Sequence, residues 1–98
     1  MPYFIETFER PGTGELRAEV RPRHLDYLAS IGSRLLACGA KLDERTGAAT
    51  GSVYLVDVGT RDAAQAIVDA DPFAEAGLIE RVRVEPFRVA VLDGTSRR

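Results

Sequence analysis

The sequence predicts an α+β fold in which four strands and two helices follow one another in the order β-α-β-β-α-β. Three observations carry this prediction. They are an aromatic and β-branched run at residues 3–8, apolar residues at helical spacing after residue 24, and a nearly continuous apolar run at residues 51–58. With 98 residues, the chain has room for one domain. This order is that of the ferredoxin-like arrangement, with a four-stranded antiparallel sheet.

The first half of the chain is expected to hold one strand and one helix. Residues 3–8 alternate, with Phe4 and Phe8 on one face of the strand. A loop rich in proline and glycine then reaches about Arg21. The helix is predicted to begin at Pro22, because proline suits a first helical turn, and to end at Gly39. Its apolar stripe consists of Leu25, Leu28, Ile31, Leu35 and Leu36, and Val20 and His24 lie on the extension of that stripe.

The middle of the chain is expected to form a hairpin and then a second helix. Residues 40–46 are predicted to pair with the strand at residues 51–58. Thr60 can cap a helix that includes the alanine-rich residues 63–70. Pro72 prevents that helix from continuing.

The last strand is expected at residues 78–92, where apolar and charged residues alternate. Pro86 indicates that this strand lies at an edge of the sheet or is bulged there. We therefore assign residues 1–92 to a single domain and residues 93–98 to a flexible tail.

Composition and charge argue against several classes of protein. The net charge is −2, which disfavours binding to nucleic-acid phosphates. No apolar run approaches the roughly 18 residues that span a bilayer, and the charged start does not look like an export signal. The single cysteine, Cys38, cannot form an internal disulfide, and a Cys/His zinc site would lack ligands. Cofactor-binding motifs are also missing from the sequence. We expect a cytoplasmic protein without a metal ion or another cofactor.

Two helices can cover only one face of a four-stranded sheet. The other face would carry an apolar row of the strand at residues 51–58. An uncovered apolar face of this size has to be buried, and a second copy of the chain is the simplest cover. The sequence therefore predicts a homodimer with sheets packed face to face.

His24 and Asp71 are the candidate catalytic residues. His24 is expected in the first turn of the first helix, facing the sheet, and imidazole suits proton transfer near neutral pH. Asp71 precedes Pro72 at the end of the second helix, where the helix dipole disfavours a carboxylate, so another role is indicated. It could orient the imidazole ring. The alternatives are a histidine that only packs at the core edge and an aspartate that only caps the next turn.

Four further residues are candidates for substrate binding. Arg21 could attract an anionic substrate, although solvated surface charge is the alternative. Ser52 and Tyr54 could offer hydroxyl groups to a pocket lined by Phe73 and Ile5, and a core or interface role is the alternative for each.

Several segments together resemble the YciI-like family over about residues 3–88. The most specific are R-P-x-H-L at residues 21–25 and A-D-P-F at residues 70–73. The others are L-L-A-C-G at 35–39, G-S at 51–52, A-A-Q-A at 63–66, A-G-L at 76–78 and V-E-P-F at 84–87. The resemblance implies a dimeric α+β barrel of ferredoxin-like protomers. It also implies a cleft in which His24 and Asp71 match the proposed dyad and Ser52 matches a lining residue.

The resemblance further implies lyase-like or dehydrochlorinase-like chemistry on hydroxylated, chlorinated aromatic compounds. From the residues, we expect a cofactor-free acid/base enzyme that acts on a small cyclic organic substrate, as a lyase or an isomerase. Two alternatives remain open. One is a non-catalytic dimeric module that binds a small ligand or a partner, and the other is a cofactor-free monooxygenase.

Overall fold

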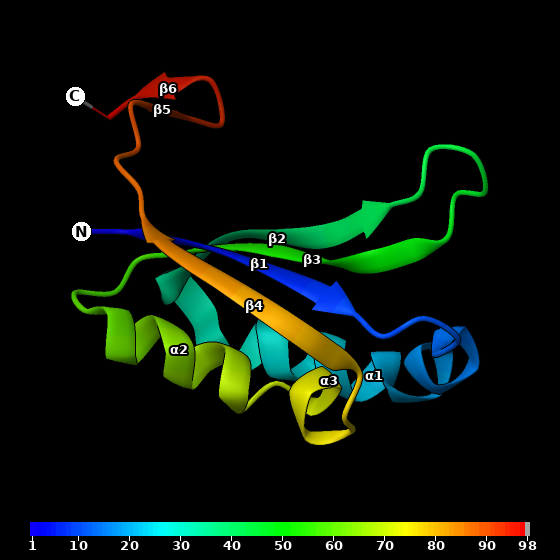
Figure 1. Ribbon diagram of the computed structural model, residues 1–98. Helices are drawn as coiled ribbons and strands as arrows, with labels where there is room; N and C mark the ends of the chain where they lie inside the picture. Colours follow the sequence, from blue (N-terminus) through cyan, green and yellow to red (C-terminus); the bar gives the residue numbers. More distant parts are fainter. Residues whose placement is uncertain (98) are drawn as a thin grey trace.

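The computed structural model describes residues 1–97 and shows a four-stranded antiparallel sheet with helices on one face (Figure 1). The strand order is β2-β3-β1-β4, so the predicted fold class is confirmed. A two-stranded hairpin, β5 with β6, lies on the side of the sheet opposite the helices. The elements are β1 (Tyr3–Glu9), α1 (Gly14–Ile31), a 3₁₀ turn (Gly32–Arg34), β2 (Leu35–Leu42), β3 (Ala49–Val56), α2 (Arg61–Asp69), α3 (Pro72–Glu75), β4 (Ile79–Pro86), β5 (Val91–Leu92) and β6 (Thr95–Ser96).

The two central strands place their alternate residues toward the helices, as the sequence predicts. Ile5 of β1 lies opposite Tyr54 of β3 and Val84 of β4, and both Ile5 and Tyr54 are fully buried. Phe4 and Phe8 point to the other face and are half-buried. The main core consists of Ile5, Ile31, Tyr54, Val56, Val58, Ala64, Ile67 and Val68. Its burial joins β1 and β3 to the helices beneath them.

The central strands approach each other closely at one glycine. A Cβ atom on Gly51 would overlap the backbone carbonyl oxygen of Thr7 and crowd the side chain of Lys41. Close backbone approach of this kind is a recognised reason for glycine inside a strand. It keeps Ser52, the next residue, in register with Thr7, whose hydroxyl oxygen accepts a hydrogen bond from the Ser52 N–H at 2.9 Å.

The boundaries predicted for the first helix are wrong at both ends. The helix α1 begins at Gly14 instead of Pro22 and ends at Ile31 instead of Gly39. Pro22 lies inside α1, where it removes one backbone hydrogen bond to Ala18. Both residues are exposed, so water can hydrogen-bond to the freed carbonyl.

The residues after α1 belong to a strand, which explains the error at its C-terminal end. Gly32 has a positive φ of 70° and ends the helix. Leu35 and Leu36 then begin β2, which pairs with β3 as a hairpin. The predicted hairpin partner is therefore present, but it is β2, which starts earlier than residue 40. Apolar residues at both helical and strand spacing made this segment ambiguous.

The second half of the chain follows the prediction more closely. The Thr60 hydroxyl oxygen caps α2 by accepting the Ala63 N–H, as expected. The strand β4 lies at an edge of the sheet, as Pro86 predicts. It ends at Pro86 and not at residue 92, because residues 91–96 form their own hairpin. The division into a domain at 1–92 and a tail at 93–98 stays a prediction, and Arg98 lies outside the described residues.

Candidate functional site

The structure brings His24 and Asp71 into contact although 47 residues separate them. His24 lies in the middle of α1, and not in a first turn as predicted, because the helix starts at Gly14. Its Nδ1 atom lies 2.8 Å from both Oδ1 and Oδ2 of Asp71. The His24 side chain is 6% exposed and that of Asp71 is fully buried. The predicted His–Asp pair is therefore present as a buried contact between α1 and the start of α3.

The position of the Asp71 side chain is fixed by its role as the N-terminal cap of α3. The Oδ1 atom accepts the Phe73 N–H at 2.8 Å, and Pro72 occupies the first helical position. The helix α2 has already ended at Asp69, so Asp71 does not sit at a C-terminus as the sequence predicted. A carboxylate at a helix N-terminus is favourable, so the dipole argument for a strained Asp71 was wrong.

The hydrogen bonds around Asp71 determine how its partners are protonated. Its oxygens accept the Tyr54 O–H, the Phe73 N–H and the Nδ1–H of His24. An ionised carboxylate has no proton to donate, so each group that hydrogen-bonds to Asp71 must supply one. The N–H of the neutral imidazole is therefore on Nδ1, the nitrogen that faces Asp71. Burial, and then the charge of Asp71, raises the pKa of the Tyr54 hydroxyl. Tyr54 therefore stays protonated and serves as a donor to Asp71.

The Nε2 atom of His24 is left without a hydrogen-bond partner among residues 1–97. No buried polar side-chain atom in this part of the chain is unsatisfied, so Nε2 must touch solvent. The site therefore holds a nearly buried imidazole with one fixed nitrogen and one nitrogen that retains some contact with solvent. That arrangement can take up or deliver a proton at Nε2.

Two residues near the pair, Arg17 and Glu9, were not predicted as site residues from the sequence, whereas Phe73 was predicted to line a pocket. The Phe73 ring stacks on the His24 ring, with centroids 3.8 Å apart and planes inclined by 12°. The Arg17 guanidinium carbon lies 4.7 Å from the Phe73 centroid, and the Arg17 Nε–H donates to Glu9 at 3.0 Å. If the helix had been predicted to start at Gly14, Arg17, seven residues before His24, would have been placed on the same helix face. The late predicted helix start hid this signal.

The other predicted site residues are not all at the dyad. Tyr54 touches Asp71 from within the core, and it lines neither of the two hollows described below. Ser52 is 2% exposed on the same face of β3. Arg21 is exposed on α1 and has no hydrogen-bond or ion-pair partner among residues 1–97. The roles of Arg21, Ser52, Tyr54 and Phe73 in substrate binding stay predictions.

Cys38 lies on β2 opposite Tyr54 and is half-buried. Burial, and then the charge of Asp71, raises the pKa of its thiol to about 11. The thiol is therefore protonated at neutral pH and unsuited to act as a nucleophile. Within residues 1–97, no three His, Cys, Asp or Glu side chains gather to form a metal site.

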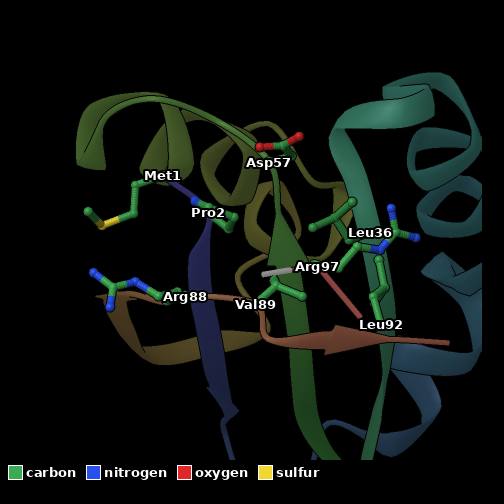
Figure 2. Close-up of a pocket in the computed structure, with 8 residues that line it drawn as sticks. All are labelled: Met1, Pro2, Leu36, Asp57, Arg88, Val89, Leu92 and Arg97. Carbon is green, nitrogen blue, oxygen red and sulfur yellow. The ribbon is translucent and has the colours of Figure 1, made fainter. Parts of the chain in front are cut away.

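Two surface hollows are described, and neither is lined by His24 or Asp71. The first, of about 380 Å³, lies between the chain start, the end of β3 and the β5–β6 hairpin. Figure 2 shows Arg88 and Arg97 on opposite sides of it, so its cationic groups do not converge on one point. The second, of about 370 Å³, lies between the β1–α1 loop and the start of β3, and Glu9 lines it. No helix within residues 1–97 is long and apolar enough to cross a membrane.

Comparison with known proteins places this geometry in context. A family model described as the YCII-related domain matches residues 1–88. Over 95 residues the chain is 39% identical to proteins named YciI from Escherichia coli O6:H1 and Shigella flexneri, covering 90% of this chain and 97% of each relative.

Two solved structures are similar to the chain as well. One is the 5-chloro-2-hydroxyhydroquinone dehydrochlorinase TftG of Burkholderia phenoliruptrix in complex with 2,5-dihydroxybenzoquinone. It has a TM-score of 0.83 and 29% identity, over 90% of this chain and 94% of that one. The other is a putative antibiotic biosynthesis monooxygenase of Chloroflexus aurantiacus, with a TM-score of 0.52 and 12% identity, over 94% of this chain and 99% of that one. The second likeness shows the fold alone.

Proposed function

The chain belongs to the YCII-related domain family, and from this premise we propose that it is a proton-transferring enzyme acting on a small hydroxylated cyclic compound. In this proposal His24 is the general acid/base and Asp71 holds its ring. The reaction is an elimination or an isomerisation that needs no cofactor. The dehydrochlorinase likeness supports the lyase-type reaction, and the buried pair supports the residues.

The observation that carries the proposal is that only one of the two imidazole nitrogens, Nδ1, is held by a hydrogen bond. Nδ1 donates to a carboxylate that is already fully engaged with Tyr54 and Phe73. Neutral His24 therefore keeps the Nε2 lone pair available to accept a proton, while Asp71 holds the ring through Nδ1. General acid/base assistance of this kind contributes about 10²–10⁴-fold to a rate.

Removal of HCl from a chlorinated hydroxyhydroquinone is a balanced reaction for such a base. In the first step Nε2 takes a proton from one ring hydroxyl and returns it to the carbon that carries chlorine. In the second step another hydroxyl loses its proton, a C=O bond forms, and the C–Cl bond breaks with its electron pair leaving as chloride. The ring is oxidised to a quinone while the C–Cl carbon becomes C–H. No external oxidant or reductant is consumed.

The test compares wild-type protein with His24→Asn in chloride release from 5-chloro-2-hydroxyhydroquinone. Asparagine can keep an N–H donor near the position of Nδ1, so Asp71 stays partnered, but it has no counterpart of Nε2. We expect His24→Asn to lose about 10²-fold or more in kcat while its melting temperature stays close to that of the wild type. Wild-type protein that neither releases chloride nor binds 2,5-dihydroxybenzoquinone would refute the substrate class.

One observation favours the non-catalytic alternative, since neither described hollow reaches the pair. In that account the contact only fastens α1 to α3. The wild type and His24→Asn distinguish the enzymatic from the structural interpretation. If the contact is purely structural, His24→Asn should change neither the rate of chloride release nor the binding of 2,5-dihydroxybenzoquinone.

We also propose a homodimer in which the open sheet face is covered by a second copy. Phe4, Val53 and Leu55 are neighbours on this face and are half-buried in the single chain. Sedimentation at micromolar concentration should give twice the monomer mass of 10.7 kDa, and Leu55→Lys should shift it to the monomer. A monomer in the wild type would contradict this proposal without affecting the dyad.

A further inference from the structure

The Phe73 ring contacts two side chains of the same helix, Arg17 and His24. Arg17 and His24 are seven residues apart on α1, which is about 10 Å along the helix axis. The imidazole lies 3.8 Å from the Phe73 ring and nearly parallel to it, and the Arg17 guanidinium carbon lies 4.7 Å from the same ring. Phe73 itself is 1% exposed. The spacing on α1 therefore allows both side chains to contact the same buried ring.

The Arg17 side chain is held in place by an ion pair. The Arg17 Nε–H donates to both carboxylate oxygens of Glu9, at 3.0 and 3.1 Å. The two side chains are 12% and 4% exposed, so the pair is screened far less than a surface ion pair. A guanidinium fixed by its Nε and lying against an aromatic ring has little freedom to move. Glu9 and Arg17 therefore support Phe73 independently of His24.

Asp71 alone does not fix the plane of the imidazole ring. The Nδ1 atom is equally distant from Oδ1 and Oδ2, at 2.8 Å each, so hydrogen bonding sets the position of Nδ1 but not the tilt of the ring. Stacking on a ring that is itself held by a second contact removes that tilt. Asp71 also accepts a hydrogen bond from the Phe73 N–H. The position of the Phe73 ring is therefore linked to the position of the carboxylate that holds Nδ1.

We propose that Phe73, supported by the Arg17–Glu9 ion pair, is a positioning residue that fixes the imidazole plane of His24 and thereby the direction of its Nε2 lone pair. The inference rests on the proposed function, in which Nε2 exchanges a proton with substrate. It replaces direct substrate contact as the role of Phe73, since this ring is covered by its two neighbours. Misorientation of a catalytic group by about 1 Å can cost on the order of 10²-fold in rate.

The single histidine of the chain makes the test direct, because only one imidazole contributes NMR signals. Ring protons above the face of an aromatic ring are shifted upfield, so the His24 signals report the stack without any substrate. Phe73→Leu removes the ring and keeps an apolar side chain. Leu78→Val is the matched control, because Leu78 belongs to the same buried cluster but carries no ring. Arg17→Met combined with Glu9→Gln removes the support without leaving a buried charge unpaired.

We expect Phe73→Leu to move the His24 ring-proton signals downfield and to lower kcat for chloride release by about 10–100-fold with little change in KM. The Arg17/Glu9 double variant should give a smaller change of the same sign, and Leu78→Val should leave both readouts near wild type. Unchanged imidazole signals in Phe73→Leu, or moved signals with unchanged kcat, would overturn the inference. If the wild type has no turnover, the proposed function fails instead, and the response of the His24 signals to the Arg17/Glu9 double variant, which keeps the Phe73 ring, decides whether the supported ring fixes the imidazole.

Discussion

Replacing Asp71 with alanine removes one buried acceptor from three donors. These are the Nδ1–H of His24, the O–H of Tyr54 and the N–H of Phe73. The aspartate is fully buried, so water cannot easily take its place. The variant therefore leaves polar groups of α1, β3 and α3 without partners in the part of the structure where these three elements meet.

The expected loss of stability follows from these donors. Each buried donor that loses its acceptor costs about 1–3 kcal/mol, so the loss of an acceptor for three donors costs about 3–9 kcal/mol before any relaxation. We take about 3–5 kcal/mol for Asp71→Ala, because local relaxation recovers part of the larger sum. For a domain of this size that corresponds to a melting temperature lower by at least about 12 °C. Asp71→Asn should lose less, because its amide oxygen can still accept the Phe73 N–H.

The matched control is Asp69→Ala, two residues earlier in the chain. Asp69 is exposed, and within residues 1–97 its carboxylate accepts only from the amide of Gln65, at 2.9 Å. A surface change of this kind stays within about 0.5 kcal/mol of wild type. Urea unfolding followed by circular dichroism would give the free energies of all variants. Equal stability of Asp71→Ala and Asp69→Ala would refute the reasoning, because it would mean that the buried donors do not depend on Asp71.

Three further predictions concern the frame around the site. Gly51→Ala should lower the free energy of unfolding by at least about 1–3 kcal/mol, because its Cβ would overlap the neighbouring strand. Gly39→Ala should not, because its Cβ would meet no atom of residues 1–97 within 4 Å, and urea unfolding checks both variants. Cys38 should react with iodoacetamide at pH 8 about a hundred times more slowly than an ordinary thiol, and Asp71→Asn should accelerate it by lowering the thiol pKa. Because the raised pKa of about 11 belongs to the folded state, the stability that this thiol contributes should be lost as pH rises from about 9 through 11. Pro22→Ala should raise the melting temperature, since it restores a helical hydrogen bond and removes a penalty of up to about 3 kcal/mol.

The sequence was sufficient for the order of the elements because β1 and β4 show a clear alternation and β3 is a nearly continuous apolar run. The runs around Ile5 and Tyr54 are apolar on the face that meets the helices, and a period of two is readable from a few residues. Helix ends are less visible. Pro22 is typical of a first turn, but the burial of Val20 and His24 on one face outweighs the single hydrogen bond that a proline removes.

The same misplaced boundary limited what could be predicted of the site. With α1 starting at Pro22, Arg17 fell in a loop, and its place on the His24 face could not be inferred. The stacking of Phe73 on His24 was not predictable either. It depends on the angle at which a four-residue helix meets α1, and no local pattern encodes that angle.

The two sequence hypotheses for Asp71, a turn cap and a partner of histidine, are compatible because a carboxylate has two oxygens. Oδ1 caps α3 through the Phe73 N–H, and Oδ2 accepts from Tyr54 while both oxygens face the imidazole. Capping places Phe73 beside the histidine in the same step that fixes Asp71. A stability loss on substitution of Asp71 is therefore expected under either function and cannot distinguish them. The discriminating change must keep the donor to Asp71 and remove Nε2, which His24→Asn does, although it also removes the ring that stacks on Phe73.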